Sequence, residues 1–279
     1  MESQVYSYND FSSLNPSYVG ILDTKQTTFY TSENINSDFD FSYSTGRAAI
    51  NIPISKIYSG FGVHATYSKF DISSDLDFGI IYSFKYEITD KIKVSLGTNL
   101  SIFRTKIKGT LVNTYWDKTD KYVNESVYLF NLDLGFWVSA YGFQIGLSNK
   151  HINEPSKEMD FLNDSIIYSI KSSMNLILNY DFHIAQKHTF SNSMLIYDLK
   201  NFSDRKYFII NNQFIINNKF IIGLSTDIYK SKDISAFLSP NVGFNLSNKF
   251  GFIVSIDLIK INSRYSLGNT IEAVLNYNF

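Results

Sequence analysis

The chain has 279 residues, no cysteine and a formal net charge of −1, so disulfides and cysteine-ligated metals are excluded and no strongly basic surface points to nucleic acid. Aromatic residues make up 16% of the sequence, with 20 Tyr and 24 Phe, yet the mean hydropathy is only −0.10. This combination is typical of a barrel whose strands turn one face to lipid and the other to a polar interior.

The N-terminal part of the chain contains no strand pattern. Residues 1–23 are expected to lie in the lumen of a barrel or over its periplasmic mouth, and residues 24–279 to form the barrel itself. Glu2, Ser3 and Gln4 directly follow Met1, so no signal peptide is visible and we interpret the sequence as the mature form of an exported protein. No apolar run is long enough for a membrane-spanning helix.

From residue 24 onward, alternating apolar and polar residues predict about fourteen antiparallel strands. Their expected ranges are 24–33, 42–54, 58–68, 74–87, 91–104, 126–138, 140–150, 166–182, 187–198, 204–216, 218–230, 234–247, 249–261 and 268–279.

The strand at 91–104 illustrates the alternation. Leu96, Leu100 and Ile102 fall on one face, while Ser95 and Asn99 fall on the other. The last strand places apolar residues on one face up to its final phenylalanine, with Val274 as the only apolar residue on the polar face. A transmembrane barrel turns its apolar faces to lipid, and the inward residues then predict a polar lumen, open or plugged.

The lengths of the junctions support the same architecture. Short junctions alternate with longer polar ones, notably 31–41, 105–125 and 150–165, as in barrels with short periplasmic turns and long outer loops. The even strand number then places both termini in the periplasm. A soluble all-β protein is the alternative, but its strands average about five or six residues, whereas most of these run to about ten or more. We therefore predict an all-β fold, a single antiparallel transmembrane β-barrel of about 14 strands, in the cell outer membrane.

Two histidines, His64 and His151, are candidates for chemistry. His64 falls on the polar face of its strand, where a lumenal histidine beside a serine would suit an outer-membrane lipase or protease. No nucleophile turn accompanies it, so a hydrogen-bonded structural histidine is favoured. His151 and Glu154 offer two metal ligands, which are too few, and a solvated loop is the preferred interpretation. The sequence predicts no enzyme and no cofactor.

The long loops hold the predicted partner-binding residues. Trp116, with Tyr115 and Lys118, lies in the loop 105–125, and His151 and Asn153 lie at the start of the loop 150–165. An exposed tryptophan in an outer loop can anchor a protein partner, or it can fold over the barrel mouth as a lid. Both alternatives remain open at this point.

Three stretches carry a family resemblance. The segment Leu14–Gly20 reads LNPSYVG and follows an aromatic-rich start. It resembles the opening of the PorP/SprF family of Bacteroidota outer-membrane proteins, which has Leu-Asn-Pro-Ala-Tyr-Ala-Gly. The segment 146–152 is similar to the family's Gly-x-Ser-x-x-His-Leu, and 270–279 is similar to its closing strand.

The resemblance implies a role in the type IX secretion system and in gliding motility. Family members export large surface adhesins or hold them at the cell surface, so the implied partner is the adhesin's C-terminal domain, with other subunits of that secretion system as further partners. The residues by themselves lead only to an outer-membrane barrel with a polar lumen, for which a passive diffusion channel for small solutes is the alternative function.

Overall fold

The computed structural model describes residues 10–35, 43–70, 73–107, 125–161, 164–184, 187–199, 206–230, 234–247, 249–257, 259–261 and 269–279. Two short N-terminal helices precede the strands, η1 (Phe11–Ser13) and α2 (Tyr18–Ile21), and a third, η2 (Ser55–Ile57), forms a turn. The strands are β1 (Gln26–Ile35), β2 (Tyr43–Ile54), β3 (Ser59–Phe70), β4 (Ser73–Thr89), β5 (Ile92–Ile107), β6 (Glu125–Ala140), β7 (Phe143–Lys150), β8 (Ser156–Phe161), β9 (Asp164–Ser169), β10 (Ser173–Ile184), β11 (His188–Tyr197), β12 (Lys206–Ile216), β13 (Phe220–Lys230), β14 (Ile234–Asn245), β15 (Phe250–Ile256), β16 (Ile259–Ile261) and β17 (Asn269–Asn278).

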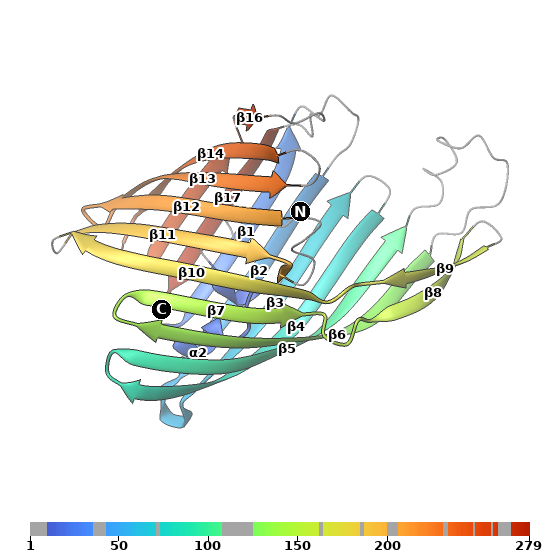
Figure 1. The fold of residues 1–279 in the computed structure, drawn as a ribbon, viewed down its shortest axis with the longest axis horizontal. Helices are drawn as coiled ribbons and strands as arrows, with labels where there is room; N and C mark the ends of the chain where they lie inside the picture. Colours follow the sequence, from blue (N-terminus) through green and yellow to red (C-terminus); the bar gives the residue numbers. More distant parts are fainter. Residues whose placement is uncertain are drawn as a thin grey trace.

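The strands close into a single antiparallel barrel (Figure 1). Each of β1 to β7 pairs with its neighbour in sequence, β7 pairs with β10, and the ladder continues to β15, then β17, which pairs back with β1. β15 and β16 both pair with β14 and share one place in the wall, so the closed barrel has 14 strands. The predicted barrel and its strand number are confirmed.

One predicted strand was too long at its start. The structure begins β10 at Ser173, and the residues before it form β8 and β9, a separate two-stranded hairpin. Apolar residues alternate with polar ones on both sides of the break, so periodicity alone does not reveal it. The loop predicted at 150–165 therefore contains β-structure.

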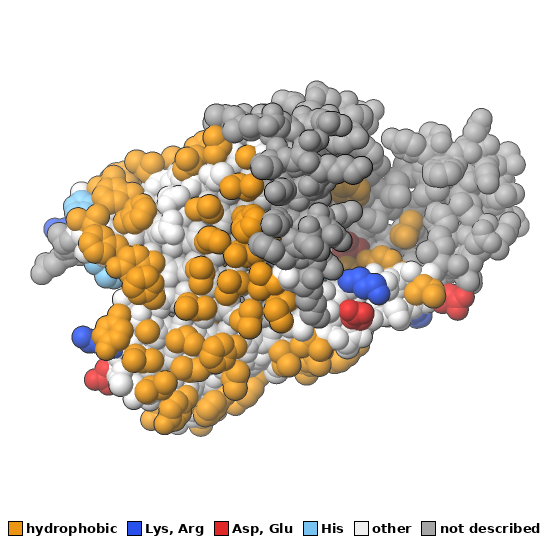
Figure 2. Space-filling model, viewed as in Figure 1, with side chains coloured by type: hydrophobic (Ala, Val, Ile, Leu, Met, Phe, Trp, Pro, Cys, Tyr) orange, Lys and Arg blue, Asp and Glu red, His pale blue; other side chains and the backbone are white. Residues whose placement is uncertain are grey.

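Apolar side chains are widespread on the face of the wall that Figure 2 shows. On β4, the outward side chains run Leu76, Phe78, Ile80, Tyr82, Phe84 and Tyr86, each 42–63% exposed. Ten residues at about 3.3 Å each, on a strand tilted by about 40°, give a height of about 25 Å. This is the height of the apolar band that such barrels present to a bilayer.

The short turns gather at one end of the barrel. Two of them use left-handed residues: Tyr141 (φ 52°) with Gly142 (φ 88°), and Asn217 (φ 53°) with Asn218 (φ 55°). Two successive positive φ values give the tight turn that matches strand twist. β1 begins and β17 ends at this same end, where the Phe279 backbone N–H donates to the Lys25 carbonyl oxygen at 3.0 Å.

At the opposite end, β4, β5 and β6 extend beyond β7, which has only 8 residues against 16 in β6. The hairpin β8–β9 packs on the inner face of this extension, with Tyr168 and Ile170 against Val127 and Leu129 of β6. None of the described helices is long and apolar enough to span a membrane.

Candidate functional site: the plugged lumen

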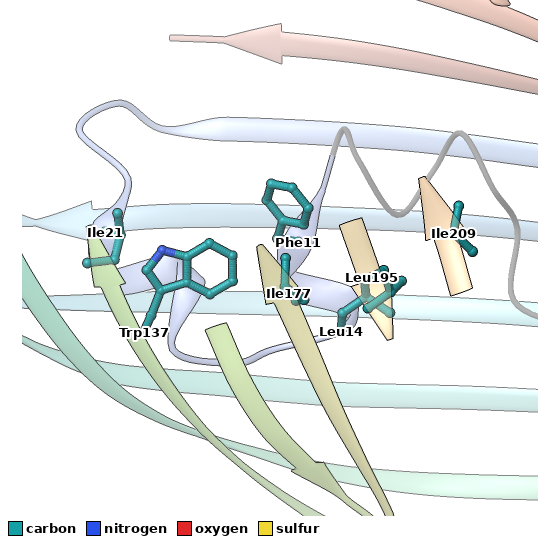
Figure 3. Packing of buried hydrophobic residues seen from close by; sticks show 7 residues of the cluster. All are labelled: Phe11, Leu14, Ile21, Trp137, Ile177, Leu195 and Ile209. Atoms are coloured by element: carbon teal, nitrogen blue, oxygen red, sulfur yellow. The ribbon is translucent and has the colours of Figure 1, made fainter. Parts of the chain in front are cut away.

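The N-terminal segment 10–22, which we call the plug, lies inside the barrel (Figure 3). Phe11, Leu14 and Ile21 from the plug pack in one apolar cluster with wall residues that point inward. The wall residues are Trp137, Ile177, Leu195 and Ile209, each at most 1% exposed. Burial of this apolar surface in an otherwise polar lumen stabilises the plug at one position on the wall.

Asn15 joins the plug to two wall strands. Its Nδ2 donates to the Phe136 carbonyl oxygen of β6 at 3.0 Å and to the Leu147 carbonyl oxygen of β7 at 3.1 Å. Its Oδ1 accepts the Ser17 backbone N–H at 3.0 Å, so the same side chain also shapes the plug's own turn. Asn15 is 0% exposed. A hydrogen bond of this kind contributes about 0.5–1.5 kcal/mol, and losing one partner in a dry site costs more.

Further hydrogen bonds hold the plug on both sides of Asn15. The Asp10 Oδ1 accepts the Ser12 backbone N–H at 3.0 Å and the Nδ2 of Asn51 on β2 at 3.3 Å. On β7, the Ser148 hydroxyl donates to the Leu14 carbonyl oxygen at 2.7 Å. The plug is therefore tied to β2, β6 and β7.

Glycines on the inner wall make room for the plug backbone. A Cβ on Gly97 of β5 would lie 2.4 Å from the Ser17 backbone nitrogen, and one on Gly60 of β3 would lie 2.5 Å from the Val19 carbonyl oxygen. Both neighbours are backbone atoms, which cannot move aside as a flexible side chain can. The close approach of plug and wall therefore requires glycine at these two positions.

Trp137 on β6 makes aromatic contacts with the plug. Its ring lies 5.4 Å from that of Phe11 and 5.1 Å from that of Tyr18, measured between centroids. A Cβ on Gly146 of β7 would lie 2.4 Å from the Trp137 ring, so this glycine lets the indole lie flat on the wall. Aromatic contacts at these separations each contribute about 0.5–1.5 kcal/mol beyond the buried area.

Tyr18 carries the plug's phenol group. Burial raises its pKa well above the usual value, and the nearby carboxylates Asp10 and Asp181 raise it further. The hydroxyl therefore stays neutral at physiological pH. Tyr18 also borders a cavity of about 400 Å³ at the short-turn end, where the Lys93 ammonium pairs with the Asp23 carboxylate at 2.6 Å.

A second cavity, of about 490 Å³, opens at the short-turn end on the other side of the lumen. Its floor contains Ile215, Ile221 and Ile253, and its walls are rich in side-chain amides, among them Gln213 and Asn276. The plug does not line this cavity.

His64 belongs to a chain of inward polar side chains. Its Nε2 lies 3.1 Å from Asn99 Oδ1, and its Nδ1 lies 3.6 Å from Asp77 Oδ2. Asn99 donates in turn to Asp133 Oδ2 at 2.8 Å. Among the described residues, the His64 ring is bonded to an amide and lies near a carboxylate, and no serine hydroxyl is bonded to it, so the geometry is that of a structural hydrogen-bonded histidine.

The two predicted partner-binding residues that the structure describes, His151 and Asn153, shape the end of the wall. His151 Nδ1 lies 2.7 Å from Asn131 Oδ1, and its backbone N–H donates to Asp133 Oδ1 at 2.8 Å. Asn153 accepts the Leu132 backbone N–H at 3.1 Å and donates to the Phe130 carbonyl oxygen at 2.7 Å. Both residues therefore contact β6.

Trp116, Tyr115 and Lys118 lie outside the described residues. Glu154, considered with His151 as a metal ligand, instead accepts the Ser172 hydroxyl at 3.0 Å. In the described ranges, no group of three or more His, Cys, Asp or Glu residues is arranged to hold a metal ion.

Sequence reasoning missed how the plug is attached. The segment LNPSYVG was singled out only for its family resemblance, but every one of its seven residues packs inside the barrel, Tyr18 partly buried and the rest fully. The inward glycines at 60 and 97 were only a partial signal: glycine weakens a strand unless another group must approach it, but glycine does not show whether that group is a separate segment or a neighbouring side chain.

Solved structures of similar fold are outer-membrane barrels. The chain superposes on the structure titled CymD monoaromatic hydrocarbon channel with a TM-score of 0.63 at 9% identity, covering 96% of this chain and 92% of that one. For the toluene transporter TbuX of Ralstonia pickettii the values are 0.59, 10%, 95% and 91%. For the outer membrane protein Omp33 of Acinetobacter baumannii they are 0.51, 9%, 92% and 98%. At these identities the likeness concerns the fold alone.

No curated protein matches the sequence. The family model described as type IX secretion system membrane protein PorP/SprF matches residues 2–277, nearly the full length. That match agrees with the LNPSYVG segment, which the structure places inside the barrel. The chain therefore belongs to the PorP/SprF family, and it is an outer-membrane barrel of the type IX secretion system.

Proposed function

We propose that this barrel binds the C-terminal domain of a large secreted adhesin and supports the export of that adhesin and its anchoring at the cell surface. The short-turn end, where β1 begins and β17 ends, faces the periplasm in this proposal, and the long-loop end faces outward. Trp116, Tyr115, Lys118, His151 and Asn153 remain the proposed contact residues in the outer loops.

The obstructed lumen is the observation that supports this role best. A diffusion channel needs a water-filled path, whereas here the plug and the wall residues beneath it bury Leu14, Trp137 and Ile177 to 1% exposure or less. A hydrogen bond that Asn15 donates to β6 and one that Asp10 accepts from Asn51 of β2 hold the plug in place. A barrel closed in this way is suited to binding a protein more than to passing solutes.

Co-purification tests the proposal. The barrel is extracted in a mild detergent from cells that secrete their adhesins, and the captured proteins are identified by mass spectrometry. We expect an adhesin C-terminal domain to be captured, and Trp116→Ala to reduce its amount relative to Lys187→Ala in a short turn. Capture of no such domain would refute the proposed function.

A passive channel for small solutes is the second candidate, because the neighbouring folds include proteins titled as channels and transporters and because two cavities open at the short-turn end. Conductance of the isolated barrel in planar bilayers separates the two functions. The plugged barrel should conduct little or not at all, and a steady open pore would favour the channel.

The orientation can be tested because the chain has no cysteine. Lys56→Cys in the turn after β2 places a single thiol at the short-turn end. In intact cells, a membrane-impermeant maleimide should fail to label this thiol, whereas lysed cells should be labelled fully. Labelling of intact cells would reverse the orientation.

A further inference from the structure

The strand β6 has an edge that the barrel wall does not use. Its register with β7 runs from Leu134↔Asn149 to Ala140↔Phe143, so β6 continues beyond β7 from residue 133 back to 125. On its other side, β6 stays paired with β5 as far as Ile107↔Glu125. In the described part of the chain, no strand forms a ladder with β6 along this outer stretch.

On the part of this edge nearest to β7, backbone groups of Leu132 and Phe130 are hydrogen-bonded by Ile152 and Asn153. Leu132 accepts the Ile152 backbone N–H at 2.9 Å and donates its own N–H to Asn153 Oδ1. The Asn153 Nδ2 then donates to the Phe130 carbonyl oxygen. A carboxamide that accepts from one residue and donates to the residue two positions away reproduces the pattern of a neighbouring antiparallel backbone.

The alternating direction of the backbone groups along β6 shows which other N–H and C=O groups lie on this edge. Backbone N–H and C=O groups of every second residue point to the same side of a strand. Since Leu132 and Phe130 point away from β5, Tyr128 and Ser126 do so as well. Within the described residues, their N–H and C=O groups have no ladder partner, and such an edge is a template for another strand.

The side chains of this stretch leave its outer face open. Tyr128 and Phe130 are each 57% exposed, whereas the hairpin β8–β9 packs against Val127 and Leu129 on the inner face. β8 lies near β6, but its ladder hydrogen bonds go to β9.

A cation lies beside the open edge. The Arg104 guanidinium is 5.6 Å from the centre of the Tyr128 ring, and its Nη2 donates to the Ser126 hydroxyl at 3.2 Å. Among the side chains that the structure describes, no carboxylate lies within ion-pair distance of Arg104. An incoming strand with an acidic side chain opposite Ser126 or Tyr128 would supply the missing charge.

We propose that the edge of β6 from Ser126 to Phe130 receives an extended strand of the protein partner, which joins the sheet by backbone hydrogen bonds and places a carboxylate next to Arg104. This inference rests on the proposed function and assigns the contact to a specific surface of the barrel. β-Augmentation of this kind derives its affinity from main-chain hydrogen bonds, and neighbouring side chains supply selectivity.

A backbone substitution tests the idea directly. Tyr128→Pro removes an N–H that faces the open edge and leaves the β5 ladder intact, and proline is tolerated at such edge positions. Tyr128→Val is the matched control, because it removes the same ring but keeps the N–H. In the co-purification experiment, the captured adhesin C-terminal domain should fall at least about tenfold with proline and stay within about twofold with valine. Arg104→Gln should give an intermediate loss.

The outcomes separate the two hypotheses. Equal capture by the proline and valine variants, with equal resistance to unfolding in detergent, would overturn the edge assignment while leaving the proposed function in place. Capture of no C-terminal domain by the unsubstituted barrel would refute the proposed function, and the edge assignment would fall with it. If Ser126→Cys barrels cross-link to each other through a bis-maleimide in cells, the edge pairs with a second copy and the proposed partner is wrong.

Discussion

The two sides of the lumen are filled in different ways. On the side of β3, β5 and β7, glycines leave space, and a separate segment of the chain, the plug, occupies it. On the side of β1 and β12 to β17, the wall fills its own interior: Tyr30, Ile221, Ile253 and Val274 pack together, each at most 6% exposed. Glycine itself is therefore no sign of a foreign segment.

Gly223 on β13 makes this contrast clear. A Cβ there would meet the side chain of Asn241 from the neighbouring strand, 2.3 Å away, whereas a Cβ on Gly97 would meet the plug backbone. The plug side depends on one continuous segment, residues 10–22, that is not part of any wall strand. The other side depends on side chains fixed to their own strands. Substitutions on the two sides should therefore have different effects on pore opening.

The largest effect is expected from Asn15→Asp. The change turns a donor into a carboxylate oxygen that faces the Phe136 and Leu147 carbonyl oxygens in a buried site. Leaving a buried charge without a partner costs about 3–5 kcal/mol. Guanidinium unfolding in detergent micelles should show this loss, while Asn218→Asp in an exposed turn should stay within about 0.5 kcal/mol. Equal stability of the two variants would show that Asn15 does not hold the plug.

Gly97→Ala should release the plug with a smaller loss of stability. The added methyl overlaps the Ser17 backbone and should cost about 1–3 kcal/mol, with an increase in single-channel conductance as the plug is displaced. Gly46→Ala is the control, because the nearest atom to its new Cβ is the Tyr30 carbonyl oxygen at 3.9 Å. Conductance that is unchanged in both variants would contradict the plug's role as the obstruction.

Val274→Ala tests the opposite side of the lumen. Removing two methyl groups from the cluster with Ile221 and Ile253 should destabilise the barrel by about 2 kcal/mol. Because no separable segment is involved, conductance should remain at the wild-type level. A larger conductance than that of Gly97→Ala would reverse the comparison between the two sides.

The smallest effect at neutral pH concerns Tyr18. Because burial raises its pKa, the stability that its neutral phenol contributes is complete below the ordinary tyrosine pKa of about 10 and is lost only as the pH rises further. Alkaline solutions should therefore loosen the plug, and Tyr18→Phe should remove that pH dependence while changing little at pH 7. Conductance measured from pH 7 to pH 11 provides the test, and identical alkaline behaviour in the phenylalanine variant would contradict it.

Strand-level features were predictable from sequence because barrel strands obey a local rule. Leu96, Leu100 and Ile102 point outward and Ser95 and Asn99 inward, as their alternation predicts, since one face meets lipid and the other the lumen. The sequence also showed that Val274 is an apolar residue on the polar face of its strand. It did not show why, because the apolar neighbours of Val274, Tyr30 and Ile221, come from distant parts of the chain.

The plug and the edge of β6 were beyond such rules. Asn15 bonds to carbonyl groups more than 100 residues away, and Asn153 bonds to Phe130 of β6, with all of β7 between them in the sequence. No local periodicity encodes either contact. The hairpin β8–β9 was missed for a related reason, because its alternation runs on into β10 without a compositional break.

The sequence by itself determined the closed antiparallel barrel, its strand number and its apolar outer band, because each follows from a period of two and from the solvent on either side of a strand. The tertiary structure alone decided that LNPSYVG fills one side of the lumen and that β6 extends beyond β7, its neighbour in the wall. Both depend on hydrogen bonds and close approaches between residues far apart in the chain, which exist only once the wall has closed.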